Sequence, residues 1–219
     1  MSEDESPAAP LLQTLLDREL IFLFFAMSEC SRAIDALEEV SRLVSNREID
    51  AERGIERREW VRVFNSIRMA LHYTGSVSRI FFPPKGKDER DKQSRARGKW
   101  LRALTNLPFD HPIKNRALRD HVEHMDQRMD GWTSVSPRAF GGVIELIVHE
   151  DLRQITVDAI EASCPLIYYP AMDRVSVFGE IFSLGEMKDW LRDVGEHISG
   201  AVIQYHEDKE PAPQLTPPV

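Results

Sequence analysis

The sequence has few of the residues and motifs that mark the best-defined classes of functional site. Its 219 residues include only two cysteines, Cys30 and Cys164. Two are too few for a zinc-finger pattern and allow one disulfide at most, and in a chain of this size two reduced thiols are the expected state. The sequence contains no glycine-rich phosphate-binding loop, no G-x-S-x-G motif, no H-E-x-x-H motif and no internal repeat. These absences argue against a P-loop NTPase, an α/β-hydrolase and a zincin metalloprotease.

Long hydrophobic runs are also missing. The most apolar run, Leu20 to Met27, has eight residues and lies between Glu19 and Glu29, whereas a membrane-spanning helix needs about 20. The first ten residues are acidic, the reverse of the basic start of a signal peptide. We therefore expect a cytoplasmic protein.

The balance of charge places a condition on nucleic-acid binding. Hydrophobic residues make up 42% and charged residues 29% of the chain, as in globular proteins, and the net charge is −8. Any binding to nucleic acid must then come from a local basic patch. Residues 85–102 hold eight basic and three acidic side chains, which suits either a solvated surface or a segment that tracks phosphates. The candidate RNA-binding residues are Lys92, Arg95, Arg97, Lys99 and, in the following helix, Arg116.

Apolar residues recur at helical spacing through most of the first 132 residues. The pattern predicts helices over 11–44, 49–80, 95–104 and 115–132, with Trp100 facing inward in the third and Asp110 capping the fourth. The predicted fold class is mainly α, a bundle of four to five helices over residues 11–132. Residues 1–10 and the proline-rich residues 207–219 are predicted to be disordered.

The pattern of the sequence changes after Trp132. Residues 133–206 are predicted to form a linker, a β-hairpin and a closing helix packed on the bundle. The hairpin pairs 166–169 with 175–179, and the closing helix begins after Ser183, which Glu186 follows at capping-box spacing. Residues 143–148 and 155–160 are rich in β-branched side chains, and their periodicity fits a strand or a short buried helix equally well.

The helix predicted over 115–132 has two distinct faces. On a helical wheel an apolar stripe runs from Leu118 to Trp132 and should face the core. The opposite face is strongly polar, with Arg119 and His124 on its two shoulders, about 140° apart. The two side chains can therefore converge only over the outer face or across a second surface.

This helix carries a short motif that resembles a known superfamily. Arg119 is followed directly by the polar residue Asp120 and, five positions on, by His124. The arrangement resembles the R-x4-6-H signature of the HEPN superfamily of helical-bundle proteins, many of which are metal-independent ribonucleases of toxin–antitoxin, abortive-infection and CRISPR-associated systems. Arg116 and His121 make a second match, although Ala117 breaks the rule of a polar residue after the arginine. The wider sequence from Ser78 onward is also similar to a group of bacterial proteins to which no activity is firmly assigned.

The resemblance implies a specific chemistry. Arg119 and His124 would be catalytic, with Asp120 positioning the imidazole from four residues away. Histidine can move a proton at neutral pH, and arginine can stabilise charge on phosphorus oxygens. The implied reaction is cleavage of RNA by its own 2′-OH, with no metal and no other cofactor. The resemblance further implies a homodimer, in which two such helices meet, and an antitoxin-like protein partner.

Two other interpretations of the same helix stay open. Arg116, Asp120, His124 and Arg128 form a ladder of alternating charge that would stabilise any solvated helix. The protein would then be a catalytically inactive helical interaction or regulatory module.

A metal site is the remaining alternative. His121 and His124, with Glu123 or Asp126, have a spacing that allows a shared ligand position, and His149, Glu150 and Asp151 are the nearest thing to a second cluster. The sequence supplies no further ligands, so no metal is predicted.

Overall fold

The computed structural model describes residues 8–45, 57–115, 117–118, 120, 124–135, 145–147 and 164–209. The helices and 3₁₀ turns are α1 (Ala8–Ser45), α2 (Arg57–Phe81), α3 (Glu89–Thr105), η1 (Pro112–Lys114), α5 (Met125–Val135), η3 (Pro170–Met172) and α7 (Leu184–Lys209). The strands are β1 (Glu145–Ile147), β2 (Leu166–Tyr169), β3 (Arg174–Val177) and β4 (Glu180–Ser183). None of the helices that the structure describes is long and apolar enough to cross a bilayer.

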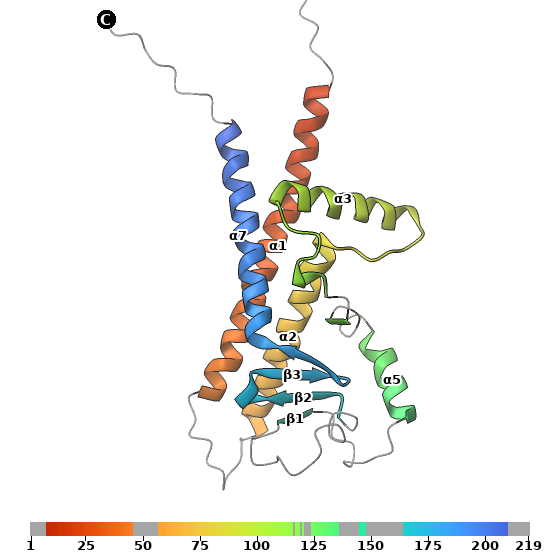
Figure 1. Cartoon of the computed structure of the whole chain (residues 1–219), viewed down its shortest axis with the longest axis vertical. Coiled ribbons are helices and arrows are strands. Elements are labelled where there is room, and N and C mark those ends of the chain that lie inside the picture. The colour runs from red at the N-terminus through yellow and green to blue at the C-terminus, as the bar shows by residue number, and fades with distance from the viewer. Residues whose placement is uncertain are drawn as a thin grey trace, which may run out of the picture.

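Three long helices, α1, α2 and α7, form the centre of the molecule (Figure 1). Each buries apolar side chains at three- and four-residue spacing, which is the pattern that places one helical face against a core. The fully buried side chains include Leu23, Ala26, Ala33, Phe64, Ile67, Ala70, Met187, Leu191, Val194 and Ile198. The closing helix α7, which was predicted to pack on a bundle of residues 11–132, is therefore itself part of the core.

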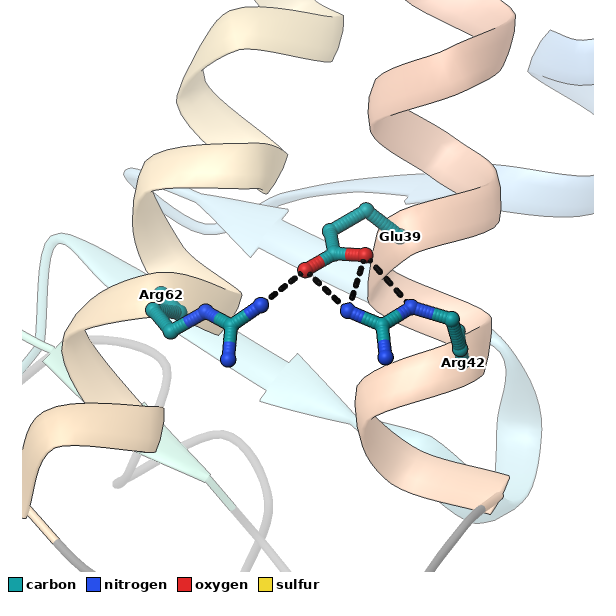
Figure 2. Close-up of polar contacts among 3 residues, drawn as sticks. All are labelled: Glu39, Arg42 and Arg62. Carbon is teal, nitrogen blue, oxygen red and sulfur yellow. Dashed lines mark hydrogen bonds and ion pairs between the residues drawn. The ribbon is translucent and has the colours of Figure 1, made fainter.

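An ion cluster at the edge of this core joins α1 to α2. The Glu39 carboxylate accepts hydrogen bonds from Nε and Nη2 of Arg42 at 2.7 Å each, and Arg62 of α2 donates to it at 2.6 Å (Figure 2). These bonds, led by the one from Arg42, lower the pKa of Glu39. The Glu39 carboxylate thus links α1 to α2 at the surface of the bundle.

A small mixed sheet closes one end of the three helices (Figure 1). Its strand order is β1-β2-β3-β4, with β1 parallel to β2 and the other pairs antiparallel. One face, with Tyr168, Val175 and Val177, packs on the main core, and the other buries Cys164, Ile167 and Tyr169.

The helix α3 lies close to the C-terminal end of α2. Gly98 makes this approach possible, because a Cβ atom there would lie 2.6 Å from Cδ of Pro83 and 2.8 Å from the Phe81 carbonyl oxygen. Arg102, one turn further on, donates a hydrogen bond to that same carbonyl. The turn of residues 82–85 is thereby held against α3.

Several sequence predictions are confirmed by these elements. The helix predicted over 11–44 and the closing helix predicted to begin after Ser183 both exist, and the hairpin pairs Leu166 with Val177 through Tyr169 with Arg174. Ser183 caps α7, since its hydroxyl accepts from the Glu186 amide. Of the two segments left open, 145–147 is a strand, whereas 155–160 lies outside the described residues.

Other predictions need correction. The helix predicted over 95–104 begins at Glu89, because the Asp88 carboxylate accepts from the Asp91 amide and caps it there. Trp100 is 38% exposed rather than inward. Strand β4 was not predicted at all. Residues 8–10 and 207–209 were predicted to be disordered, but they belong to α1 and α7.

The helix predicted over 115–132 also differs from expectation. Its start is capped by Asn115, whose side-chain oxygen accepts from the amides of Ala117 and Leu118, and not by Asp110. Leu118 is buried, yet none of the described side chains of α5 is. Accordingly α5 lies to the side of the bundle (Figure 1). Among the stripe residues whose burial the structure describes, Leu118 is buried, and Met129 and Trp132 are half-buried.

Candidate functional site

A pocket of about 720 Å³ lies where the basic segment meets the helical turn that carries His124. It is lined by Phe82, Pro83, Pro84, Lys85, Arg95, Arg102, Phe109, Lys114, Asp120, His124, Gln127 and Arg128. Five of these side chains are cationic and one is a carboxylate. In a protein of net charge −8, this is the local positive site that phosphate binding requires.

Two residues of the motif, Asp120 and His124, reach the pocket together with Arg128. The His124 amide donates to the Asp120 carbonyl at 3.2 Å, and the Arg128 amide donates to the His124 carbonyl at 2.9 Å. This four-residue spacing places Asp120, His124 and Arg128 on one face. All three line the pocket, so these three members of the charge ladder face a concave surface and not open solvent alone.

Two aromatic rings of the pocket, Phe82 and Phe109, contact two of its cations. The Arg102 guanidinium lies 4.7 Å from the centre of the Phe82 ring and 5.6 Å from that of Phe109, and the Lys114 ammonium lies 3.5 Å from the latter. Partial burial lowers the pKa of Arg102, although a guanidinium stays protonated at neutral pH. Arg95 is held in turn by a 2.7 Å hydrogen bond to the Gly86 carbonyl.

The predicted RNA-binding residues do not all reach this pocket. Arg95 lines it. Lys92 is exposed and pairs with Glu89 at 3.1 Å, Arg97 packs its guanidinium 4.3 Å from the Phe22 ring of α1, and Lys99 is exposed elsewhere on α3. The predicted residues Arg116 and Arg119 lie outside the described residues.

The structure adds functional candidates that were not selected from the sequence. Lys85 and Arg102 belong to the basic segment, and Arg128 belongs to the charge ladder. The sequence therefore marked each as part of a charged group but did not distinguish it from the other members of that group. Lys114 and Phe109 lie in the turn between α3 and the helical turn that follows, and only the folded chain brings them to the pocket.

A second pocket, of about 480 Å³, lies between the end of α3 and α7. Its ionisable lining residues are Asp193, Glu196 and His197. The acidic excess makes this pocket a poor site for phosphate.

Metal and thiol chemistry find little support in the described part of the chain. Within it, no group of three or more histidine, cysteine, aspartate or glutamate side chains is arranged to hold a metal ion. His121, Glu123 and residues 149–151 lie outside it. Cys30 and Cys164 are free and buried, and burial raises their thiol pKa values to about 12 and about 11. Such thiols are poor nucleophiles.

Comparison of the chain with protein-family models, with curated proteins and with solved structures finds no significant match. The pocket and the motif are therefore the basis for assigning a function.

Proposed function

We propose that the protein is a HEPN-like, metal-independent endoribonuclease that cleaves RNA by attack of a ribose 2′-OH, of the toxin or defence type that the resemblance implies. The observation that carries the proposal is the pocket in which His124 and Asp120 lie among Lys85, Arg95, Arg102, Lys114 and Arg128. A proton-transfer group surrounded by fixed cations is the arrangement that this reaction needs.

The reaction is a transesterification at phosphorus. The 2′-oxygen loses its proton and bonds to the adjacent phosphorus, and the bond from phosphorus to the 5′-oxygen breaks. The products are a 2′,3′-cyclic phosphate and a 5′-OH, which receives a proton. His124 carries one of the two proton transfers. Arg119, which precedes Asp120 directly, and the cations of the pocket stabilise the charge on the phosphorus oxygens.

The proposal includes the homodimer that the resemblance implies. A second chain would bring its own motif helix toward the pocket, so that the site would contain residues of both chains. His124 and the cationic residues already line one pocket within a single chain, so RNA binding itself does not depend on the dimer.

The test is incubation of the native protein with RNA in the presence of EDTA. We expect cleavage to products ending in a 2′,3′-cyclic phosphate, and we expect His124→Ala to lose it by about 10²- to 10⁴-fold, the usual contribution of a general acid or base. His72→Ala, which removes an exposed histidine from α2, is the matched control. A substrate with 2′-O-methyl groups should resist cleavage. Equal cleavage by the native protein and His124→Ala, or cleavage by neither, would sink the proposal.

One observation favours the alternative, an inactive helical interaction or regulatory module. Ile21, Phe24 and Phe25 of α1 are 68%, 51% and 49% exposed, and neighbouring exposed apolar side chains mark protein–protein contacts. The double variant Phe24→Ser/Phe25→Ser tests this surface by sedimentation. Self-association lost in the variant, together with no ribonuclease activity in the native protein, would favour the alternative.

A further inference from the structure

Phe109 is an exposed aromatic ring at a charged site. The residue is 67% exposed, yet it lines the pocket that contains the five cationic side chains. Its ring is held in position, because it packs edge-on against the buried ring of Phe82, with 6.5 Å between centroids and 62° between planes. A large apolar surface is thus fixed in place and presented to solvent inside a positive pocket.

Two cations from two elements lie close to this ring. Lys114, the last residue of η1, places its ammonium 3.5 Å from the ring centre, and the Arg102 guanidinium of α3 lies 5.6 Å from it. Arg102 is fixed further by its bond to the Phe81 carbonyl, whereas Lys114 is exposed on a flexible stem. One cation is therefore rigid and the other is able to leave the ring and follow a phosphate.

An aromatic ring beside cations has a well-defined ligand chemistry. Every nucleobase has a flat face that stacks on such a ring, and the phosphates on either side of the base are then within reach of the cations. Stacking requires an unpaired base, since the faces of a base within a duplex are covered by its neighbours. A base is also held without regard to its identity, because stacking involves no hydrogen bonds to base edges.

We propose that Phe109 is a stacking platform for one unpaired base, and that the pocket therefore takes single-stranded RNA with little base specificity. The inference rests on the proposed ribonuclease function and names the substrate class of the same site. The stacked nucleotide sets which phosphate lies beside His124. Lys114 exchanges its contact with the ring for a contact with the phosphate of the stacked nucleotide.

The test measures binding separately from cleavage. The probe is a fluorescein-labelled single strand of 2′-O-methyl RNA, which cannot be cleaved because it has no free 2′-OH, compared by anisotropy with a duplex of the same sequence. We expect the native protein to prefer the single strand. Phe109→Ala should weaken that binding between about fivefold and about 150-fold, the range for loss of one base stack. Met172→Ala, which removes a similarly exposed apolar side chain from η3 outside the pocket, should bind as the native protein does.

A conservative variant guards against a general loss of structure. Phe109→Trp keeps an aromatic face, so it should bind within a few-fold of the native protein, and its added tryptophan fluorescence should be quenched when the single strand binds. Unchanged single-strand binding by Phe109→Ala, or equal affinity of the native protein for duplex and single strand, would overturn the inference.

The two proposals fail in different ways. Loss of binding in Phe109→Ala, with cleavage that does not depend on His124, would support the stacking site and contradict the ribonuclease proposal. Cleavage that depends on His124, with no effect of Phe109→Ala on binding, would support the ribonuclease proposal and contradict the stacking site.

Discussion

His111 and Asp193 join the turn before the pocket to the closing helix α7. The imidazole Nε2 of His111 donates to Oδ2 of Asp193 at 2.9 Å, and its Nδ1 accepts from the Ile113 amide at 3.1 Å. The second contact requires a bare Nδ1, so the neutral imidazole satisfies both contacts and the protonated one does not. Protonation would place two N–H groups against each other at a residue that is only 6% exposed.

This geometry predicts how stability depends on pH. Burial lowers the pKa of His111, and the repulsion from His197 adds to it, while Asp193 and Asp110 oppose the shift. The pKa of His111 is lower in the folded than in the unfolded chain. At any pH between these two pKa values, the unfolded chain therefore binds more protons than the folded chain. The contribution of His111 to the free energy of unfolding is therefore complete above about pH 6.5, and it is lost as the pH falls below that value.

The measurement is urea unfolding between pH 5 and pH 8. We expect the free energy of unfolding of the native protein to fall on acidification, and His111→Gln to flatten that dependence. His206→Gln removes an exposed histidine near the end of α7 and is the matched control. If the free energy of unfolding depended on pH in His111→Gln as it does in the native protein, another group would be responsible for that dependence.

A second prediction concerns the phosphate contacts. Arg128 is exposed and lines the pocket, so it should contact one phosphate of a bound single strand. For single strands the logarithm of the binding constant falls with the logarithm of salt concentration by about 0.7 per phosphate neutralised. Arg128→Gln should reduce that slope by about 0.7. Arg174→Gln makes the same charge change on β3, outside the pocket, and should leave the slope as it is.

Much of the fold was predictable because it follows from local signals. The apolar spacing of α1, the two apolar runs of the hairpin and the Ser183 cap are each visible within a short stretch of sequence. Strand β4 was missed because Glu180 and Ile181 are exposed and only Phe182 is buried. An edge strand paired on one side carries no strong apolar pattern.

The site was predictable only in part. The motif selected His124 and Asp120, and the basic segment selected Arg95, because charge and spacing are visible in sequence. Phe109 and Lys114 depend on how η1 turns against α3, which is a tertiary contact without a local signature. Arg97 is the opposite case, because it was selected from the sequence but its guanidinium packs against the Phe22 ring and does not line the pocket.

A third prediction tests whether α7 belongs to the bundle core. Leu191 is fully buried, whereas Ile203 of the same helix is 58% exposed. Leu191→Ala should lower the free energy of unfolding by about 2–5 kcal/mol, because it leaves a cavity. Ile203→Ala should change it by no more than about 0.5 kcal/mol. Urea unfolding of the two variants provides the comparison, and equal small losses would mean that α7 packs only loosely.

The last prediction concerns the glycine that lets α3 approach the 82–85 turn. Alanine is favoured over glycine in a helix by about 0.8–1.0 kcal/mol, and at Gly195 of α7 an added Cβ atom would meet nothing within 4 Å. Gly195→Ala should therefore stabilise the protein by about that amount. At Gly98 the same Cβ atom would lie less than 3 Å from Pro83 and from the Phe81 carbonyl, and overpacking costs about 1–3 kcal/mol.

Gly98→Ala should consequently destabilise the protein or leave it unchanged, although its helix propensity improves. The clash pushes α3 away from the turn, and with it Arg102, whose bond to Phe81 anchors one wall of the pocket. Binding of the single-stranded probe should weaken in Gly98→Ala and stay normal in Gly195→Ala. If both variants gained stability equally and bound RNA equally, the close approach of α3 to the turn would not be what shapes the pocket.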